Sequence, residues 1–170
     1  RLIAFADDRR SGAVEQPAAA TDVEDVLSPL VVQEFGFQHD RVQQAAYGLI
    51  EESRQRLVHL TIGRRLRATL SPEALKERIF EVVDHLNFGR ELIDEREERT
   101  ALAKLNLDAR RKASDASAYA AALSYVRNAQ TLLGEDGWTS AYELMIEVFR
   151  QRAALEYLNG NFDRCSEIVA

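Results

Sequence analysis

The spacing of apolar and polar residues predicts that most of this chain is helical. From about residue 39 onward, apolar side chains recur three or four positions apart, which lines them up along one face of a helix. The most regular stripe consists of Val42, Ala45, Ala46, Leu49 and Ile50. Further stripes predict one helix over about 53–70, one after Ser71, one after Asp94, one over about 116–133, one after Ser140 and one over 162–170.

Several residues mark where these helices begin and end. Ser71 followed by Pro72 is typical of a helix start, because serine caps free N–H groups and proline suits the first turn. The run Asn159-Gly160-Asn161 predicts a sharp turn. Capping boxes, in which two residues satisfy each other's backbone N–H groups, are predicted at Asp94 with Glu97 and at Ser140 with Glu143.

The helix predicted over 53–70 is rich in arginine. Its apolar residues Leu57, Leu60 and Ile62 are predicted to point inward. The arginines could form an anion-binding face, or they could form a solvated surface balanced by Glu51 and Glu52. We prefer the solvated surface, because mixed charge along a helix is typical of exposure to water.

One cluster has the composition of a phosphate-binding site. Phe35-Gly36-Phe37 alternates in the manner of a short strand, and His39-Asp40 then precedes a helix. The free N–H groups at a helix start favour a phosphate, and an imidazole can add a hydrogen bond to it. The residues alone leave open whether His39 binds phosphate or serves as a cap or packing residue. Residues 1–34 show no comparable pattern.

A weak internal repeat relates two of the predicted turns. Tyr119 is followed by Ala122 and Val126, and the same spacing of aromatic, small and β-branched residues begins at Phe162. The offset is 43 residues, longer than the usual ~34 of tetratricopeptide repeats, which the pattern otherwise resembles. In such repeats, stacked helical hairpins bind protein segments along a concave surface. The alternative is a pair of ordinary helical hairpins.

Composition narrows the possible classes of function. The 170 residues are 46% apolar and 29% charged with a net charge of −6, which gives no support to nucleic-acid binding. No apolar run approaches the roughly 20 residues that span a membrane, so we expect no membrane partner. The single cysteine, Cys165, is consistent with a reducing cytoplasm. Because the chain begins at Arg1 and ends within a predicted helix, we expect it to belong to a longer protein.

The motifs of common catalytic and cofactor sites are missing from the sequence. There is no GxxxxGKS or GxxxxGKT phosphate loop, no GxGxxG, no HExxH and no GxSxG. His39, His59 and His85 are far apart in sequence and have no neighbouring cysteine, so we expect no metal site. Asp84-His85 lies among apolar residues, which favours a packing role over acid–base catalysis. We therefore expect no enzymatic activity in this chain.

The stretch FQHDRVQQAAYGLI at 37–50 resembles the winged-helix end of the STAND class of ATPases. It is similar to a family of large bacterial proteins that join a serine/threonine kinase, such an ATPase, a helical-repeat region and often a sensor histidine kinase. The resemblance covers about residues 35–170 and keeps the order of the family. It continues through 59–66, 80–89, 105–122 and 156–162.

This resemblance implies a mainly α fold in two parts. A winged-helix-like end of an ATPase module would occupy 1–70, and TPR-like antiparallel helical hairpins, an α-solenoid, would occupy 71–170. His39 and Asp40 would sense the phosphate of ATP or ADP bound by an ATPase core outside this chain, with Gln38 departing from the family's usual Met. The expected partners are the neighbouring ATPase and kinase domains and a protein or peptide bound on the repeats.

Three functions remain as alternatives. The leading one is a non-catalytic regulatory and interaction segment of a cytoplasmic bacterial signalling protein, which couples nucleotide state to partner binding. The second is a self-standing TPR-like adaptor that binds a peptide without any link to nucleotide. The third is a histidine phosphotransfer module built on His39 or His85, which would require those side chains to be exposed.

Overall fold

The computed structural model describes residue 45 and residues 47–170. The predicted strand at 35–37 and the pair His39-Asp40 therefore lie outside the described residues. Throughout the described part the regular secondary structure is helical, which confirms the mainly α prediction. The elements are α2 (Glu52–Thr69), α3 (Pro72–Glu77), α4 (Ile79–Phe88), the short 3-10 helix η1 (Arg90–Leu92), α5 (Arg96–Asp115), α6 (Tyr119–Leu133), α7 (Gly137–Ser140), α8 (Tyr142–Leu158) and α9 (Phe162–Val169).

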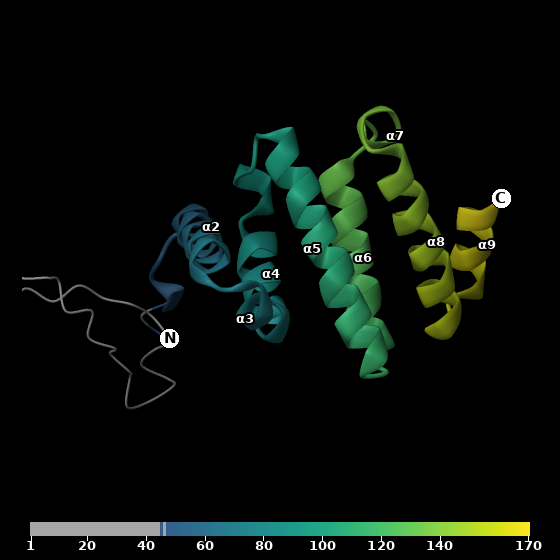
Figure 1. The fold of residues 1–170 in the computed structure, drawn as a ribbon, viewed down its shortest axis with the longest axis horizontal. Coiled ribbons are helices and arrows are strands. Elements are labelled where there is room, and N and C mark those ends of the chain that lie inside the picture. The colour runs from purple at the N-terminus through teal and green to yellow at the C-terminus, as the bar shows by residue number, and fades with distance from the viewer. Residues whose placement is uncertain (1–44, 46) are drawn as a thin grey trace, which may run out of the picture. The chain divides into compact units, whose positions relative to one another are not determined.

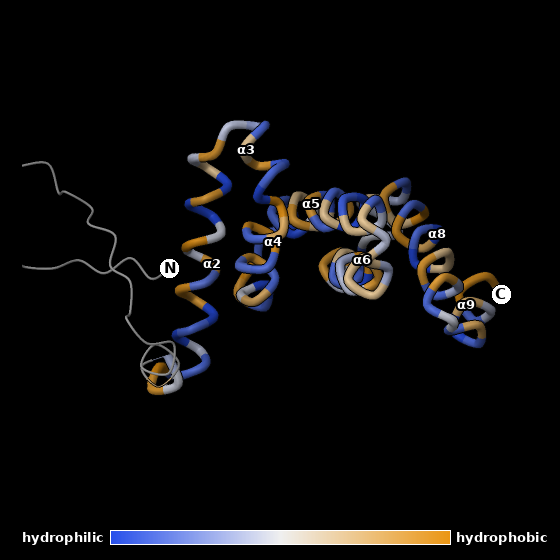
Figure 2. The backbone as a smooth tube through the Cα atoms, turned by 90° about the horizontal axis from the view of Figure 1, so that it is seen from below, coloured by the Kyte–Doolittle hydropathy of each residue, from blue (hydrophilic) through white to orange (hydrophobic). Residues whose placement is uncertain are grey.

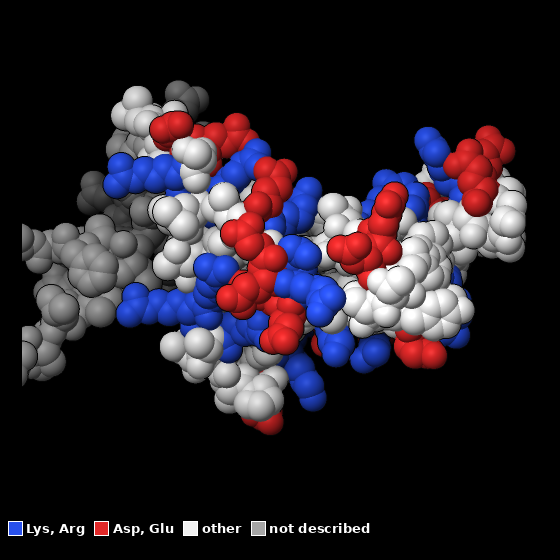
Figure 3. Space-filling view, turned by 90° about the horizontal axis from the view of Figure 1, so that it is seen from above, with Lys and Arg blue, Asp and Glu red and all other residues white. Residues whose placement is uncertain are grey.

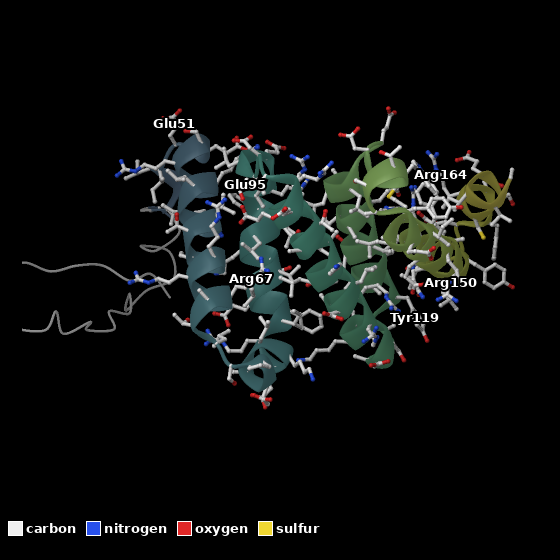
Figure 4. All side chains as sticks on the ribbon, turned by 45° about the horizontal axis from the view of Figure 1, so that its top comes forward. Glu51, Arg67, Glu95, Tyr119, Arg150 and Arg164 are labelled. Carbon is white, nitrogen blue, oxygen red and sulfur yellow. The ribbon has the colours of Figure 1, made fainter. Side chains whose placement is uncertain are left out.

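Within residues 50–170, the long helices lie side by side in the order of the sequence (Figure 1). Helices α2 and α4, α5 and α6, and α8 and α9 pack as pairs, and α4–α5 and α6–α8 contacts join one pair to the next. Glu51 and Glu95, which precede α2 and α5, lie at the same end of these helices (Figure 4). The chain therefore forms successive hairpins that run back and forth across one row.

Buried apolar residues pack between the helices in two clusters, a large one and a small one formed by Ile79, Val83 and Ala109. Figure 2 shows hydrophobic and hydrophilic residues alternating along each helix, as the predicted stripes require. The inward residues come from every long helix up to α8, and include Leu60, Val82, Leu102, Val126 and Val148.

Two glycines bring α2 and α4 unusually close together. A Cβ atom at Gly63 would lie 2.7 Å from the Leu86 side chain, and one at Gly89 would lie 2.6 Å from the backbone oxygen of Arg56. Neither position has room for a larger residue without movement of its neighbours. The close approach fixes how the side chains of the two helices face each other.

A pair of buried amides joins α4 to α5. The Asn87 amide nitrogen donates to the Asn106 side-chain oxygen at 2.9 Å, and the Asn106 nitrogen donates back at 3.0 Å. The Asn106 nitrogen also donates to the Leu102 carbonyl. Because an unpaired buried amide is costly, this reciprocal bonding favours one register of α4 against α5.

The two turns related by the predicted repeat have the same backbone geometry. The N–H of Ala118 donates to the Ala113 carbonyl at 2.9 Å, and the N–H of Asn161 donates to the Glu156 carbonyl at 2.8 Å. A second pair of equivalent bonds links Ser117 to Ser114 and Gly160 to Tyr157. These bonds are the two that define a Schellman ending of a helix, and every atom pair in one turn recurs 43 residues later in the other.

The left-handed residue of each turn also matches. Ser117 has φ of 58° and Gly160 has φ of 77°. The first residue after each turn is the aromatic that the repeat identified, since α6 begins at Tyr119 and α9 begins at Phe162. The repeat therefore relates two helical hairpins with the same connection.

Some predicted helix ends are confirmed and others are wrong. The hydroxyl of Ser71 accepts from the N–H of Ala74, with Pro72 at the first helical position, as predicted. The capping box at Asp94 is absent, because α5 begins later, at Arg96, and the Asp94 carbonyl accepts instead from the Arg99 side chain.

The capping box predicted at Ser140 is also wrong. Ser140 ends the short helix α7 and its hydroxyl donates to the Asp136 carbonyl, while Ala141 occupies the N-cap position of α8. The inward placement of Leu57 is wrong as well, since that side chain is 55% exposed while Leu60 is buried.

The chain separates into two units, residues 1–49 and residues 50–170. Within the second unit, α2 ends before residue 70 and packs against α4, which begins after it. The predicted division of the chain into parts 1–70 and 71–170, with distinct origins, stays a prediction.

Candidate interaction surface

An open hollow between α6, α7 and α8 combines charged, amide and aromatic side chains. We call it the α6–α8 hollow, and its volume is about 530 Å³. Buried Met145 and half-buried Phe149 provide its apolar lining. Its remaining lining residues are Arg127, Gln130, Thr131, Gly134, Glu135, Trp138 and Arg152.

Aromatic side chains form one edge of this hollow. The Trp138 ring lies 5.1 Å from that of Phe149 and 6.0 Å from that of Tyr142, measured between ring centres. Tyr142 and Ile146 extend the exposed apolar surface along α8. Figure 3 shows acidic and basic side chains interleaved over α2, α4 and α5, and a largely uncharged area over α7 and the start of α8. Exposed aromatic rings beside polar groups are typical of protein-binding surfaces.

The polar edge of the hollow is built around Glu156, whose side chain is fully buried. Arg127 Nη2 donates to both carboxylate oxygens, at 2.8 and 3.0 Å, and its Nε donates at 3.2 Å. Asn161 Nδ2 donates to the carboxylate at 2.8 Å. Arg152 lies farther, at 3.5 Å, and donates to the Gln130 side chain at 2.5 Å. One carboxylate therefore joins α6, α8 and the turn before α9.

The electrostatic balance at Glu156 favours its charged form. Burial raises the pKa of this carboxyl, but the hydrogen bonds from Arg127 and Asn161 and the positive charge of Arg127 outweigh burial and lower the pKa. Two guanidinium groups face the hollow, while Glu156 and Glu135 provide compensating negative charge.

A second hollow of about 630 Å³ lies between α5 and α8. Farther along α5, Arg110 Nε and Ser114 Oγ are buried without a hydrogen-bond partner among the described residues. Burial lowers the pKa of Arg110, as does Arg111, and the negative charge of Glu147 on α8 opposes the shift. Helix α5 therefore contains two buried polar side chains whose hydrogen-bonding capacity is not fully used.

The structure brings His59 and His85 together, which the sequence did not suggest. His59 Nδ1 lies 2.9 Å from His85 Nδ1, and the His59 ring lies 4.4 Å from the ring of Phe88. Asp84 does not orient His85 as a catalytic pair would, since it accepts a hydrogen bond from the Tyr125 hydroxyl. His85 is half-buried, which does not fit the exposure that phosphotransfer requires.

Neither a metal site nor a membrane span is found in the described chain. No three His, Cys, Asp or Glu side chains of residues 45 and 47–170 gather closely enough to hold a metal ion. The helices described here are each too short or too polar to cross a lipid bilayer. His39 and Asp40, the residues expected to sense nucleotide, are outside the described residues, and their role stays a prediction.

Sequence reasoning missed Glu156, although a signal was present. Met145, Phe149 and Arg152 continue to Glu156 at helical spacing, which places Glu156 on the inner stripe of α8. A charged residue at such a position indicates a buried ion pair. Its partner Arg127 lies 29 residues earlier, and no local pattern identifies it.

Comparison with known proteins finds similarity to a signalling protein. The chain is 31% identical, over 161 aligned residues, to the "Hybrid signal transduction histidine kinase G" of Dictyostelium discoideum. The alignment covers 79% of this chain but 5% of the relative, so the chain corresponds to a small segment of it. No family model matches the sequence. No solved structure matches it either.

This similarity supports a signalling-related segment and leaves the finer expectations open. The expected bacterial origin and the STAND ATPase class are not shown, since the relative is from Dictyostelium and its name mentions no ATPase.

Proposed function

We propose that this chain is a non-catalytic regulatory and interaction segment of a larger signalling protein, with TPR-like hairpins stacked as an α-solenoid. The observation that carries the proposal is the pair of identical helix-ending turns 43 residues apart, each opening a second helix with an aromatic. The similarity to a segment of a signalling histidine kinase supports the same proposal.

The α6–α8 hollow is the surface we assign to a protein or peptide partner. Its exposed aromatic edge can bury apolar side chains, and Arg127, Arg152 and Gln130 can orient polar ones. Trp138 is the single tryptophan of the chain. A partner that enters the hollow will therefore change the tryptophan emission.

For the N-terminal part, we propose a winged-helix-like end of a STAND-class ATPase. His39 and Asp40 would contact the phosphate of ADP or ATP bound by the neighbouring ATPase core. A ligand shifts an equilibrium only by its differential affinity for the two states. Loss of the contact with the phosphate would therefore change the balance between two states of the parent protein.

The test is nucleotide binding by a longer chain that includes the ATPase core, with His39 intact and with His39→Ala. We expect His39→Ala to weaken ADP binding roughly tenfold, the value of one hydrogen bond to a charged group, and to affect ATP less. Isothermal titration calorimetry measures both affinities.

Gln44→Ala is the matched control, since it lies in the same motif but outside the His-Asp pair. If His39→Ala leaves both affinities at the level of Gln44→Ala, the nucleotide link is wrong. The adaptor without a nucleotide link would then be the better description of the chain.

A further inference from the structure

The contact between His59 and His85 lies near the two close glycine contacts of α2 with α4. His59 is on α2 between Arg56 and Gly63, and His85 is on α4 beside Leu86. The two glycines described above let the helices approach closely here, because neither carries a side chain that would hold them apart. The 2.9 Å separation of the two Nδ1 atoms is therefore a property of the α2–α4 packing.

A hydrogen bond between two Nδ1 atoms restricts the protonation of the pair. One nitrogen must carry a proton and the other must offer a lone pair. Two neutral rings satisfy this when one is the Nδ1–H tautomer, and one neutral ring with one imidazolium also satisfies it. Two imidazolium rings do not, because both nitrogens then donate and both rings are positive.

The surrounding groups determine how easily the second proton is taken up. Burial lowers the pKa of both imidazoles, and the charge of His85 lowers that of His59 further. On α4, Glu81 and Asp84 oppose the shift at His85, but Arg78 holds Glu81 and the Tyr125 hydroxyl of α6 donates to Asp84. On the α2 side, Arg56 pairs with Glu52 and with Glu91 of η1.

We propose that the His59–His85 pair is an acid-sensitive latch between α2 and α4, which holds while at most one ring is protonated and opens when both are. This role is independent of the proposed function, because it depends on the contact between α2 and α4. Opening the latch would loosen the pair α2–α4 while α5 and α6 stay packed.

The direction of the pH effect follows from the two shifts. An unfolded histidine titrates at about pH 6.5, and both folded pKa values lie below that. The unfolded chain therefore binds more protons than the folded chain in mild acid. The contribution of the pair to stability is full above about pH 6.5 and is lost as the pH falls through the folded pKa values.

The first experiment measures urea unfolding of the full chain between about pH 7.5 and about pH 5.5. The variants are His59→Gln, His85→Gln and the double variant, with His39→Gln to account for the remaining histidine. We expect the parent's urea midpoint to fall on acidification. The double variant should lose part of this pH dependence. Either single substitution should lose most of that same part, because it removes one member of the pair. If the double variant keeps the parent's pH dependence, the latch does not exist.

Nitrogen-15 NMR of the imidazoles gives a second test that needs no variant. At about pH 7.5 we expect one ring of the pair to carry its proton on Nδ1, which is the less common tautomer of free histidine. On acidification the backbone signals of α2 should shift together with the two rings. Two rings that both carry the proton on Nε2 alone would overturn the proposal, even if the variants fail to fold.

Discussion

Glu156 is a charged residue whose side chain is fully buried. A carboxylate without partners would be destabilised by several kcal/mol in such a position. The bidentate contact with Arg127 and the bond from Asn161 compensate that cost. Arg127 itself is half-exposed, so water shares the solvation of its guanidinium group. The Arg127–Glu156 pair therefore stabilises the fold mainly through hydrogen bonds to a buried charge, and less through the attraction between the two charges.

We predict that Glu156→Gln destabilises the protein by about 2 kcal/mol near neutral pH, since hydrogen bonds to a charged group contribute roughly 1.5–3 kcal/mol. The lowered pKa of Glu156 means that its stabilisation is present above about pH 4.3 and is lost as the pH falls further. The difference between parent and variant should therefore shrink in acid. Urea unfolding at several pH values measures it.

Glu167→Gln is the matched control for this prediction. Glu167 pairs with Arg164 on the surface of α9, and both side chains are more than 60% exposed. We expect a loss of about 0.5 kcal/mol or less, as for other exposed pairs. Equal losses of stability in the two variants would mean that burial does not strengthen the ion pair of Glu156.

The buried polar residues show which properties of single side chains could be predicted from the sequence. Helical spacing places Asn106 and Glu156 on inner stripes, so their burial was predictable. Their partners were not, because Asn87 and Arg127 come from other helices. The meeting of His59 with His85 has the same origin, since it depends on the crossing of α2 and α4.

The turns at 116–118 and 159–161 connect two hairpins with the same hydrogen bonds but with different residues at the left-handed position. A left-handed backbone strains most residues by about 1–2 kcal/mol, and glycine avoids that strain. Gly160 therefore suits its position, and Ser117 does not. Glycine also loses more entropy on folding, by roughly 0.5–1 kcal/mol, which offsets part of the gain.

We predict opposite effects for exchanging these two residues. Ser117→Gly should stabilise the protein by up to about 1 kcal/mol, and Gly160→Ser should destabilise it by a similar amount. Thermal unfolding of both variants checks the prediction. No atom lies within 4 Å of a Cβ built at Gly160, so a loss there reports the backbone and not a steric clash. Effects of the same sign would contradict the shared geometry.

Helices were easier to predict than their ends. Apolar periodicity identified α2, α6, α8 and α9 closely, because one face of each packs on a neighbour. Both capping boxes failed, because α5 begins at Arg96 and α8 at Tyr142, so neither Asp94 nor Ser140 directly precedes its helix. Asp94 offers its carbonyl to Arg99, and Ser140 closes the turn of α7. Local capping motifs are weaker signals than a stripe that many residues share.

Across the whole of residues 50–170, burial is uneven. Helices α5 and α6 each have neighbours on two sides and contain six buried residues each. Helix α9 contacts mainly α8 and contains no buried residue. Its apolar residues Phe162 and Val169 are exposed. Stability should therefore decrease from the centre of the row toward α9.

We predict that hydrogen exchange follows this gradient. Backbone amides of α9 should exchange through local opening, much faster than those of α5 and α6, which should exchange only with global unfolding. Mass spectrometry of exchanged peptides resolves these helices. Mild urea should accelerate exchange in α5 and α6 far more than in α9, and uniform protection of all three would contradict the gradient.

At the scale of the molecule, the sequence predicted the order of hairpins but not how they meet. The mainly α composition and the repeat at Tyr119 and Phe162 were visible in the sequence. The hollow lined by Trp138 and Arg127 was not, because its walls come from separate helices and the short helix α7 was not predicted. Such surfaces arise from packing between segments, which a periodic pattern does not encode.

The neighbour-to-neighbour packing has a mechanical consequence. A displacement imposed on α2 travels toward α9 mainly through the α4, α5, α6 and α8 contacts, one after another. Springs connected in series add their compliances, so the row as a whole bends more readily than any of its helices. The most compliant helix–helix contact then dominates the deformation. Stiffening the other contacts would change the bending of the row little.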